Sequence, residues 1–176
     1  MAESSNLAEI INGCKAGEAE SFSQLIDIYS RRCCGYFYRL TGNTEISDDL
    51  LSKLFVKLVE KISSYKGGSF EGWLFKIASN IFHDYLRVKQ RRKKLLEVQK
   101  RQLETKVAGT REAEAERIDK LQIQLGKLDA DTRELIILRF YSQLSFKEIA
   151  RMRSEPIGTA LSKVHRGLKK LRELME

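Results

Sequence analysis

A single proline in 176 residues, Pro156, is the feature that most constrains how this chain can fold. Proline breaks the hydrogen-bond ladder of a helix interior, so the long stretch before residue 156 is free to form long helices. Apolar residues recur three and four positions apart through most of the chain, which is the period of a helix and not of a strand. The sequence therefore predicts an all-α protein.

Amphipathic helices are expected on both sides of an early stop signal. Residues 21–40 and 47–62 each place their apolar side chains on one broad stripe, and Gly42 lies between them. Ser47 is the expected N-cap of the second helix. After a glycine-containing break, a long third helix is expected from Trp73 onward.

The composition changes abruptly after this third helix begins. Residues 87–101 contain eight lysines and arginines and one acid, Glu97. Residues 102–115 are polar, include Gly109 and carry no apolar stripe, which is typical of a flexible linker. We therefore predict two small helical domains with the boundaries 1–96 and 116–176, joined by a linker at 97–115.

The second domain carries a helix-turn-helix pattern. Helices are expected at residues 118–128, 132–141, 146–151 and 157–174. Ser145 and Glu148 form a capping box that starts the third of these, and Pro156 suits the entry to the last. An ordinary helical hairpin with a solvated basic face is the alternative. Residues 147–172 carry eight cations against two acids, which favours a nucleic-acid-binding module.

The last helix combines side chains that read base edges with cations that bind phosphates. The candidate contacts are Thr159, Ser162, Lys163, His165, Arg166 and Lys169.

Other classes of protein find little support. The net charge of +8 favours an anionic partner. Cys14, Cys33 and Cys34 offer neither a disulfide framework nor paired zinc-site spacing, so they are expected to be reduced and mostly buried. No segment reads as a signal peptide or a membrane span, which predicts a cytoplasmic protein. With two histidines and no glycine-rich phosphate loop, we expect no enzyme activity, catalytic residue, cofactor or metal.

Two separated blocks resemble the extracytoplasmic-function group of bacterial sigma factors. Residues 144–150, with 156–159 and 162–166, look like region 4, which in that family reads the minus-thirty-five element. Residues 49–51 and 73–80, with Phe55, Asp84, Arg87 and Arg91, look like region 2. The resemblance covers nearly the whole chain. It implies a factor that binds core RNA polymerase and promoter DNA, with an anti-sigma factor as a candidate further partner.

In this family the loop at residues 64–70 and the helix after it bind the non-template strand of the minus-ten element. Capturing an unstacked base needs an apolar pocket with cations beside it. The matching candidates are Tyr65, Lys66, Phe70, Asn80, Arg87, Arg91 and Arg92. Trp73 is expected to pack in the core more readily than to stack on a base. Asn80 could instead be a buried hydrogen-bonding residue between helices.

The resemblance also places the polymerase docking surface on the second helix. The matching residues are Asp48, Asp49, Leu50, Leu51 and Phe55. A metal site at the two aspartates is disfavoured, because adjacent helical residues diverge and no histidine is near. The chain departs from the family pattern at Ser52-Lys53, Ser154, Ala160 and Leu161, which alters particular contacts. A helix-turn-helix repressor or activator remains the second hypothesis, although it leaves the first domain unexplained.

Overall fold

The computed structural model describes residues 2–102 and 120–175, and in these residues it contains helices and turns but no strand. The expected all-α class is therefore confirmed. The elements are α1 (Ala2–Ala16), α2 (Ala19–Thr41), α3 (Thr44–Lys61), the 3-10 turn η1 (Ile62–Ser64), α4 (Phe70–Gln102), α5 (Lys120–Gly126), α6 (Ala130–Ile136), the π-helical turn η2 (Ile137–Tyr141), α7 (Phe146–Arg153) and α8 (Ile157–Met175).

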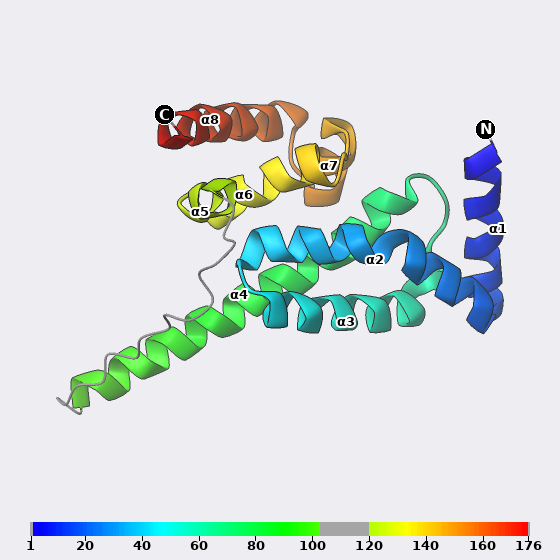
Figure 1. The fold of residues 1–176 in the computed structure, drawn as a ribbon, viewed down its shortest axis with the longest axis horizontal. Helices are drawn as coiled ribbons and strands as arrows, with labels where there is room; N and C mark the ends of the chain where they lie inside the picture. Colours follow the sequence, from blue (N-terminus) through cyan, green and yellow to red (C-terminus); the bar gives the residue numbers. More distant parts are fainter. Residues whose placement is uncertain (1, 103–119, 176) are drawn as a thin grey trace.

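The first domain is built from α1–α4. Helices α2 and α3 lie side by side, α4 crosses them, and α1 stands across one end of α2 (Figure 1). Gly42 ends α2 in the left-handed conformation with φ 67°, and its N–H donates to the Tyr38 carbonyl at 2.8 Å. Glycine adopts this conformation without a Cβ penalty, so the predicted stop signal is confirmed.

The start of α3 differs from the prediction. The Asn43 side chain, not Ser47, caps the helix, because its Oδ1 accepts a hydrogen bond from the Ile46 N–H at 2.9 Å. Ser47 is buried inside the helix, where its hydroxyl donates to the Asn43 carbonyl at 2.6 Å. The prediction of Ser47 as N-cap was wrong, since one residue after Gly42 suffices to begin the next helix. Asp48 and Asp49 consequently lie beyond the first turn of α3.

Helix α1 was not among the expected elements. Leu7, Ile10, Ile11 and Cys14 face the core of the first domain from this helix. Their spacing of three and four residues is the same signal that identifies the other helices.

The second domain consists of α5–α8. The capping box at the start of α7 is confirmed: the Glu148 N–H donates to Ser145 Oγ at 3.2 Å and the Ser145 N–H donates to Glu148 Oε2 at 2.8 Å. Helix α8 crosses α6 closely at Gly167, where a Cβ atom would lie 2.3 Å from Thr132 Cγ2. The small residue lets the two helices meet.

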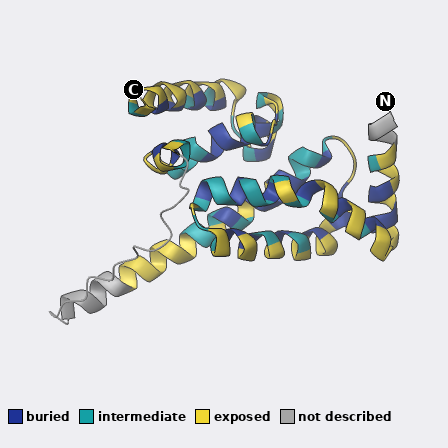
Figure 2. Ribbon diagram, viewed as in Figure 1, coloured by how far each residue is buried: buried dark blue, intermediate teal, exposed yellow. Residues whose placement is uncertain are grey.

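Helix α4 is longer than the first domain needs. It continues to Gln102, past the predicted domain end at residue 96. Residues 87–95 of α4, which extend beyond the core of the first domain, are exposed (Figure 2). The remainder of the predicted linker, residues 103–115, lies outside the described residues, and the domain boundaries stay predictions.

The two domains touch each other directly. Helix α7 contacts α4, while α5, α6 and η2 lie along α2 (Figure 1). The face of α2 and the start of α4 are thereby covered by the second domain.

Candidate nucleic-acid interface

The helix-turn-helix gives the second domain an outward polar face on α8. Helix α7 ends at Arg153, and the C-cap that follows, Ser154, adopts φ 54° and ψ 40° and donates its N–H to the Ala150 and Arg151 carbonyls. Serine here accepts a left-handed conformation that glycine would adopt more easily. After Pro156, α8 turns its apolar side inward and buries Ala160, Val164 and Leu171.

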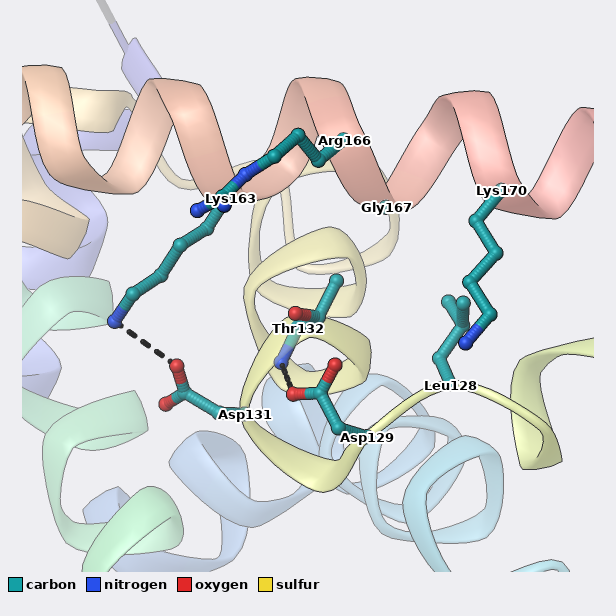
Figure 3. Close-up of a pocket in the computed structure, with 8 residues that line it drawn as sticks. All are labelled: Leu128, Asp129, Asp131, Thr132, Lys163, Arg166, Gly167 and Lys170. Carbon is teal, nitrogen blue, oxygen red and sulfur yellow. Dashed lines mark hydrogen bonds and ion pairs between the residues drawn. The ribbon is translucent and has the colours of Figure 1, made fainter.

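The six candidate contacts on α8, which we call the reading face, differ in exposure. Ser162, His165, Arg166 and Lys169 are exposed, whereas Thr159 and Lys163 are half-buried. The Lys163 ammonium lies 3.0 Å from Asp131 Oδ2 and 3.0 Å from Glu155 Oε2. Figure 3 shows Lys163 reaching from α8 down to Asp131, along a groove of about 340 Å³. Lys163 is thus held by the second domain's own acids.

Arg166 and Lys170 lie along the same groove, farther toward the end of α8 (Figure 3). Opposite them, Asp129 caps α6 by accepting the Thr132 N–H at 2.9 Å. Burial raises the pKa of Asp129, but hydrogen bonds from Thr132 outweigh it and leave the pKa below its usual value. Asp129 therefore stays ionised opposite the cations of α8.

The second candidate surface lies on the first domain, at residues 64–70 and along α4. Tyr65 and Phe70 are buried, with ring centroids 5.3 Å apart, and Trp73 lies 5.5 Å from each. The Tyr65 hydroxyl donates to the Gly68 carbonyl at 2.7 Å and closes the loop. Trp73 is half-buried and packed against the core, as expected. These rings form the apolar floor of the loop.

The polar candidates around this floor face solvent. Lys66 and Asn80 are exposed, so the alternative of Asn80 as a buried residue between helices is wrong. Arg87, Arg91 and Arg92 are exposed along α4. Arg87 pairs with Asp84 one turn earlier, at 2.5 Å. We call the seven candidates Tyr65, Lys66, Phe70, Asn80, Arg87, Arg91 and Arg92 the minus-ten face.

The candidate docking residues on α3 differ in how far they are exposed. Asp48 and Asp49 are exposed, and Leu51 and Phe55 are half-buried. Leu50 is only 1 % exposed and belongs to the core, so as a direct docking contact it was wrongly predicted. Its place follows from the helical stripe it shares with Leu54 and Leu58, which point inward.

The sequence interpretation missed an apolar groove beside this helix. Val56 on α3 and Val88 on α4 are exposed, and with Ile81 and Tyr85 they line a groove of about 490 Å³. The signal for this groove in the sequence was the presence of two valines, Val56 and Val88, outside the apolar stripes that α3 and α4 turn toward the core.

The cysteines and acidic residues carry no site of their own. Cys14 and Cys33 are buried as expected, and Cys34 is half-buried. Burial raises the pKa of Cys33 to about 12, which keeps its thiol protonated and unreactive. Among the described residues no group of three or more potential metal ligands comes together. Nor does any described helix combine the length and apolarity needed to span a membrane.

Comparison with known proteins identifies both domains. Residues 25–92 match the family model of sigma-70 region 2, and residues 118–171 match that of sigma-70 region 4. The chain is 26 % identical to the ECF RNA polymerase sigma factor SigW of Bacillus subtilis, over 93 % of each protein. It is 27 % identical to the ECF RNA polymerase sigma-E factor of Haemophilus influenzae, over 100 % of this chain and 96 % of that one.

Solved structures agree with the sequence matches. The sigma factor RpoE of Bartonella quintana, in complex with the anti-sigma factor NepR, aligns with a TM-score of 0.70 and 27 % identity. That alignment covers 89 % of this chain and 98 % of RpoE. CnrH, in complex with the cytosolic domain of CnrY, gives the same TM-score at 21 % identity and so supports the fold.

Proposed function

The chain belongs to the extracytoplasmic-function group of bacterial sigma factors, which direct core RNA polymerase to promoters, and from this we propose which of its residues contact each promoter element. The reading face of α8 contacts the minus-thirty-five element, and the minus-ten face contacts the minus-ten element. The observation that carries this proposal is the presence of two outward cationic surfaces, one on each domain.

On the second domain, base recognition falls to exposed side chains. Ser162, His165 and Arg166 stand on the solvent side of α8, where a helix can enter the major groove. Lys169 is placed to contact phosphate. Lys163 must exchange Asp131 and Glu155 for the DNA backbone, which makes it the weaker contributor.

On the first domain, we assign different tasks to the buried and exposed members of the minus-ten face. The rings of Tyr65 and Phe70 form the floor against which an unstacked base can rest. Lys66 and Asn80 reach the base edges and sugar. Arg87, Arg91 and Arg92 neutralise phosphates along α4.

The same proposal covers the partners. Asp48, Asp49, Leu51 and Phe55 dock the polymerase, and Leu50 positions them from the core. The polymerase supplies the chemistry, so this chain acts by binding and orientation and has no catalytic residue. We place its action in the cytoplasm, where polymerase and DNA meet. Since the sigma factor RpoE of Bartonella quintana, which shares this fold, is bound to the anti-sigma factor NepR, we further propose an anti-sigma factor as a partner.

In-vitro transcription tests the function directly. Purified bacterial core polymerase is run on a genomic DNA library with and without this protein, and the transcript starts are sequenced. New, discrete starts that need the protein are expected, with shared sequence elements at both promoter positions. The absence of new starts, together with tight dimeric binding to duplex DNA, would instead favour the repressor hypothesis.

A further inference from the structure

We propose that Leu161 of α8 is a further specificity-determining residue, which reads the methyl group of a thymine in the minus-thirty-five element. The inference deepens the proposed function and rests on the location of the reading face given there. It is carried by an apolar side chain that stands exposed among the polar side chains of that face.

Leu161 points away from the core that its neighbours on α8 help to form. Ala160 and Val164 are 0 % and 3 % exposed, whereas Leu161 is 45 % exposed. Each residue of a helix adds about 100° of rotation, so Leu161 lies about 100° from Ala160 and about 60° from Val164 around the axis. Leu161 therefore stands outside the buried stripe of α8, at the edge of the reading face.

The same side chain shares a concavity with three members of the reading face. Leu161, Ser162, His165 and Arg166 line an open hollow of about 460 Å³ on α8. His165 follows Leu161 by four residues, so the two lie within about 40° of each other around the helix axis. A base edge that enters this hollow meets one apolar side chain and three polar ones.

A second exposed apolar residue precedes Leu161 by one turn. Ile157 is also 45 % exposed, and it is the first residue of α8, directly after Pro156. Leu161 lines the hollow with the polar reading residues, whereas Ile157 does not. We therefore assign the methyl contact to Leu161 and regard Ile157 as an extension of the apolar edge toward the turn.

The chemistry of the major groove determines what a leucine at this place can recognise. A recognition helix brings its N-terminal residues to the base edges, and Leu161 is the fifth of the 19 residues of α8. A leucine side chain binds no phosphate and forms no hydrogen bond with a base. The thymine C5-methyl is the one methyl group that the four base pairs present in the major groove. Contact with that methyl group is therefore the base recognition that Leu161 can perform.

Deoxyuridine tests this contact, because uracil lacks only the methyl group and pairs with adenine as thymine does. In a promoter found by the library experiment, each thymine of the minus-thirty-five element is replaced in turn, on either strand. The affinity of the complex of core polymerase and this protein is measured by mobility shift. Burying one methyl group changes an equilibrium constant by about fourfold, so we expect one position at which uracil weakens wild-type binding by about that factor.

Leu161→Ala links the effect to the proposed residue. Its complex should bind the thymine promoter at least about fourfold more weakly than the wild type and lose nothing further when uracil stands at the sensitive position. Leu168→Ala is the matched control: it removes a leucine 37 % exposed on nearly the same side of α8, about 10 Å farther from the start of the helix. This variant should keep the full sensitivity to uracil.

Two results would overturn the inference alone. One is a protected minus-thirty-five element to which wild-type binding is indifferent to uracil at every position. The other is a Leu161→Ala variant that keeps the full uracil effect while its affinity for core polymerase without DNA falls, which would place Leu161 in a protein contact. If the wild-type complex protects no minus-thirty-five element, the proposed function and the inference both fall.

A cation at the same position gives an independent test. Leu161→Arg replaces the apolar contact with a charge that DNA attracts, so its complex should lose the uracil effect. Its affinity should also depend more steeply on salt, by about one unit in the slope of log affinity against log salt concentration. A Leu161→Arg variant with the wild-type uracil effect and the wild-type salt slope would show that residue 161 does not face the DNA, and would overturn the inference.

Discussion

The two domains hold their functional surfaces in place by different means. The first is organised around large buried rings, with Tyr36, Phe37, Phe75 and Phe82 fully enclosed. The second has a smaller apolar core, and its last two helices are also tied by ion pairs: Arg153 of α7 contacts Asp131, and Lys163 of α8 contacts both Asp131 and Glu155. The surface of the first domain is therefore held in place by apolar packing. The position of α8 in the second domain depends also on ion pairs, whose cations DNA phosphates can bind instead.

The largest effect is expected where packing dominates. Phe75→Ala should lower the free energy of unfolding by about 3–5 kcal/mol, because it opens a cavity in the centre of the first domain. Denaturant titration followed by circular dichroism measures it. Val56→Ala, at a side chain 59 % exposed, is the control and should change stability by less than about 0.5 kcal/mol. A loss below about 1 kcal/mol for Phe75→Ala would contradict the contrast between the domains.

The charged interior of the second domain should respond differently. Arg153→Met leaves the buried Glu134 carboxylate without its guanidinium partner, so that only His83 and Tyr36 of the first domain contact it, at a cost of about 3 kcal/mol in unfolding free energy. Adding Glu134→Leu should recover at least half of that loss, since both charges are then gone. A double-mutant cycle by thermal unfolding checks this coupling. Purely additive losses would show that the pair does not act as a unit.

Polymerase docking should fail with little change in stability, although the exposed Asp49–Lys53 ion pair is lost. Asp49→Lys reverses an exposed charge on α3, and we expect core polymerase affinity to fall at least about 100-fold, or roughly 2.8 kcal/mol. Fluorescence anisotropy of labelled protein measures the binding. Glu60→Lys, near the other end of the same helix, is the matched control. Equal affinities for the two variants would remove Asp49 from the docking surface.

A smaller and more selective effect is expected on α8. Arg166→Ala should weaken binding of the polymerase complex by about 1–2 kcal/mol, through the minus-thirty-five element. Footprinting on a promoter found in the library experiment should show protection lost there and kept at the minus-ten element. Lys147→Ala, an exposed cation on α7 outside the reading face, is the control. An unchanged footprint would exclude Arg166 as a reader.

Local signals in the sequence predicted the local structure well. Gly42 ends α2 and the capping box starts α7 as expected, because each depends on a few neighbouring residues. The N-cap of α3 was misplaced because the C-cap of α2, Gly42, is followed directly by the N-cap of α3, Asn43, with no separate loop between the helices. Leu50 was taken from the family pattern as a docking contact, although the periodicity of α3 already placed it inside.

The contacts between the domains could not be predicted in the same way. Glu134, Gln122 and Arg133 are polar side chains whose hydrogen-bond partners on α2 lie 84 to 98 residues away in the sequence. No periodicity links such distant residues. An acid directly before the apolar run 135–138 was the one local hint of a buried carboxylate.

Helix α4 runs without interruption from the loop at residues 64–70 to Gln102. Its 33 residues give a rod of about 50 Å, since each residue adds about 1.5 Å. Each residue also adds about 100° of rotation, so Arg87 and Arg91, four apart, lie on one side. Two residues inserted between them would turn Arg91 by about 200° relative to Arg87, and the rest of α4 by the same angle. The number of residues between Arg87 and Arg91 therefore determines which side of α4 carries the two charges.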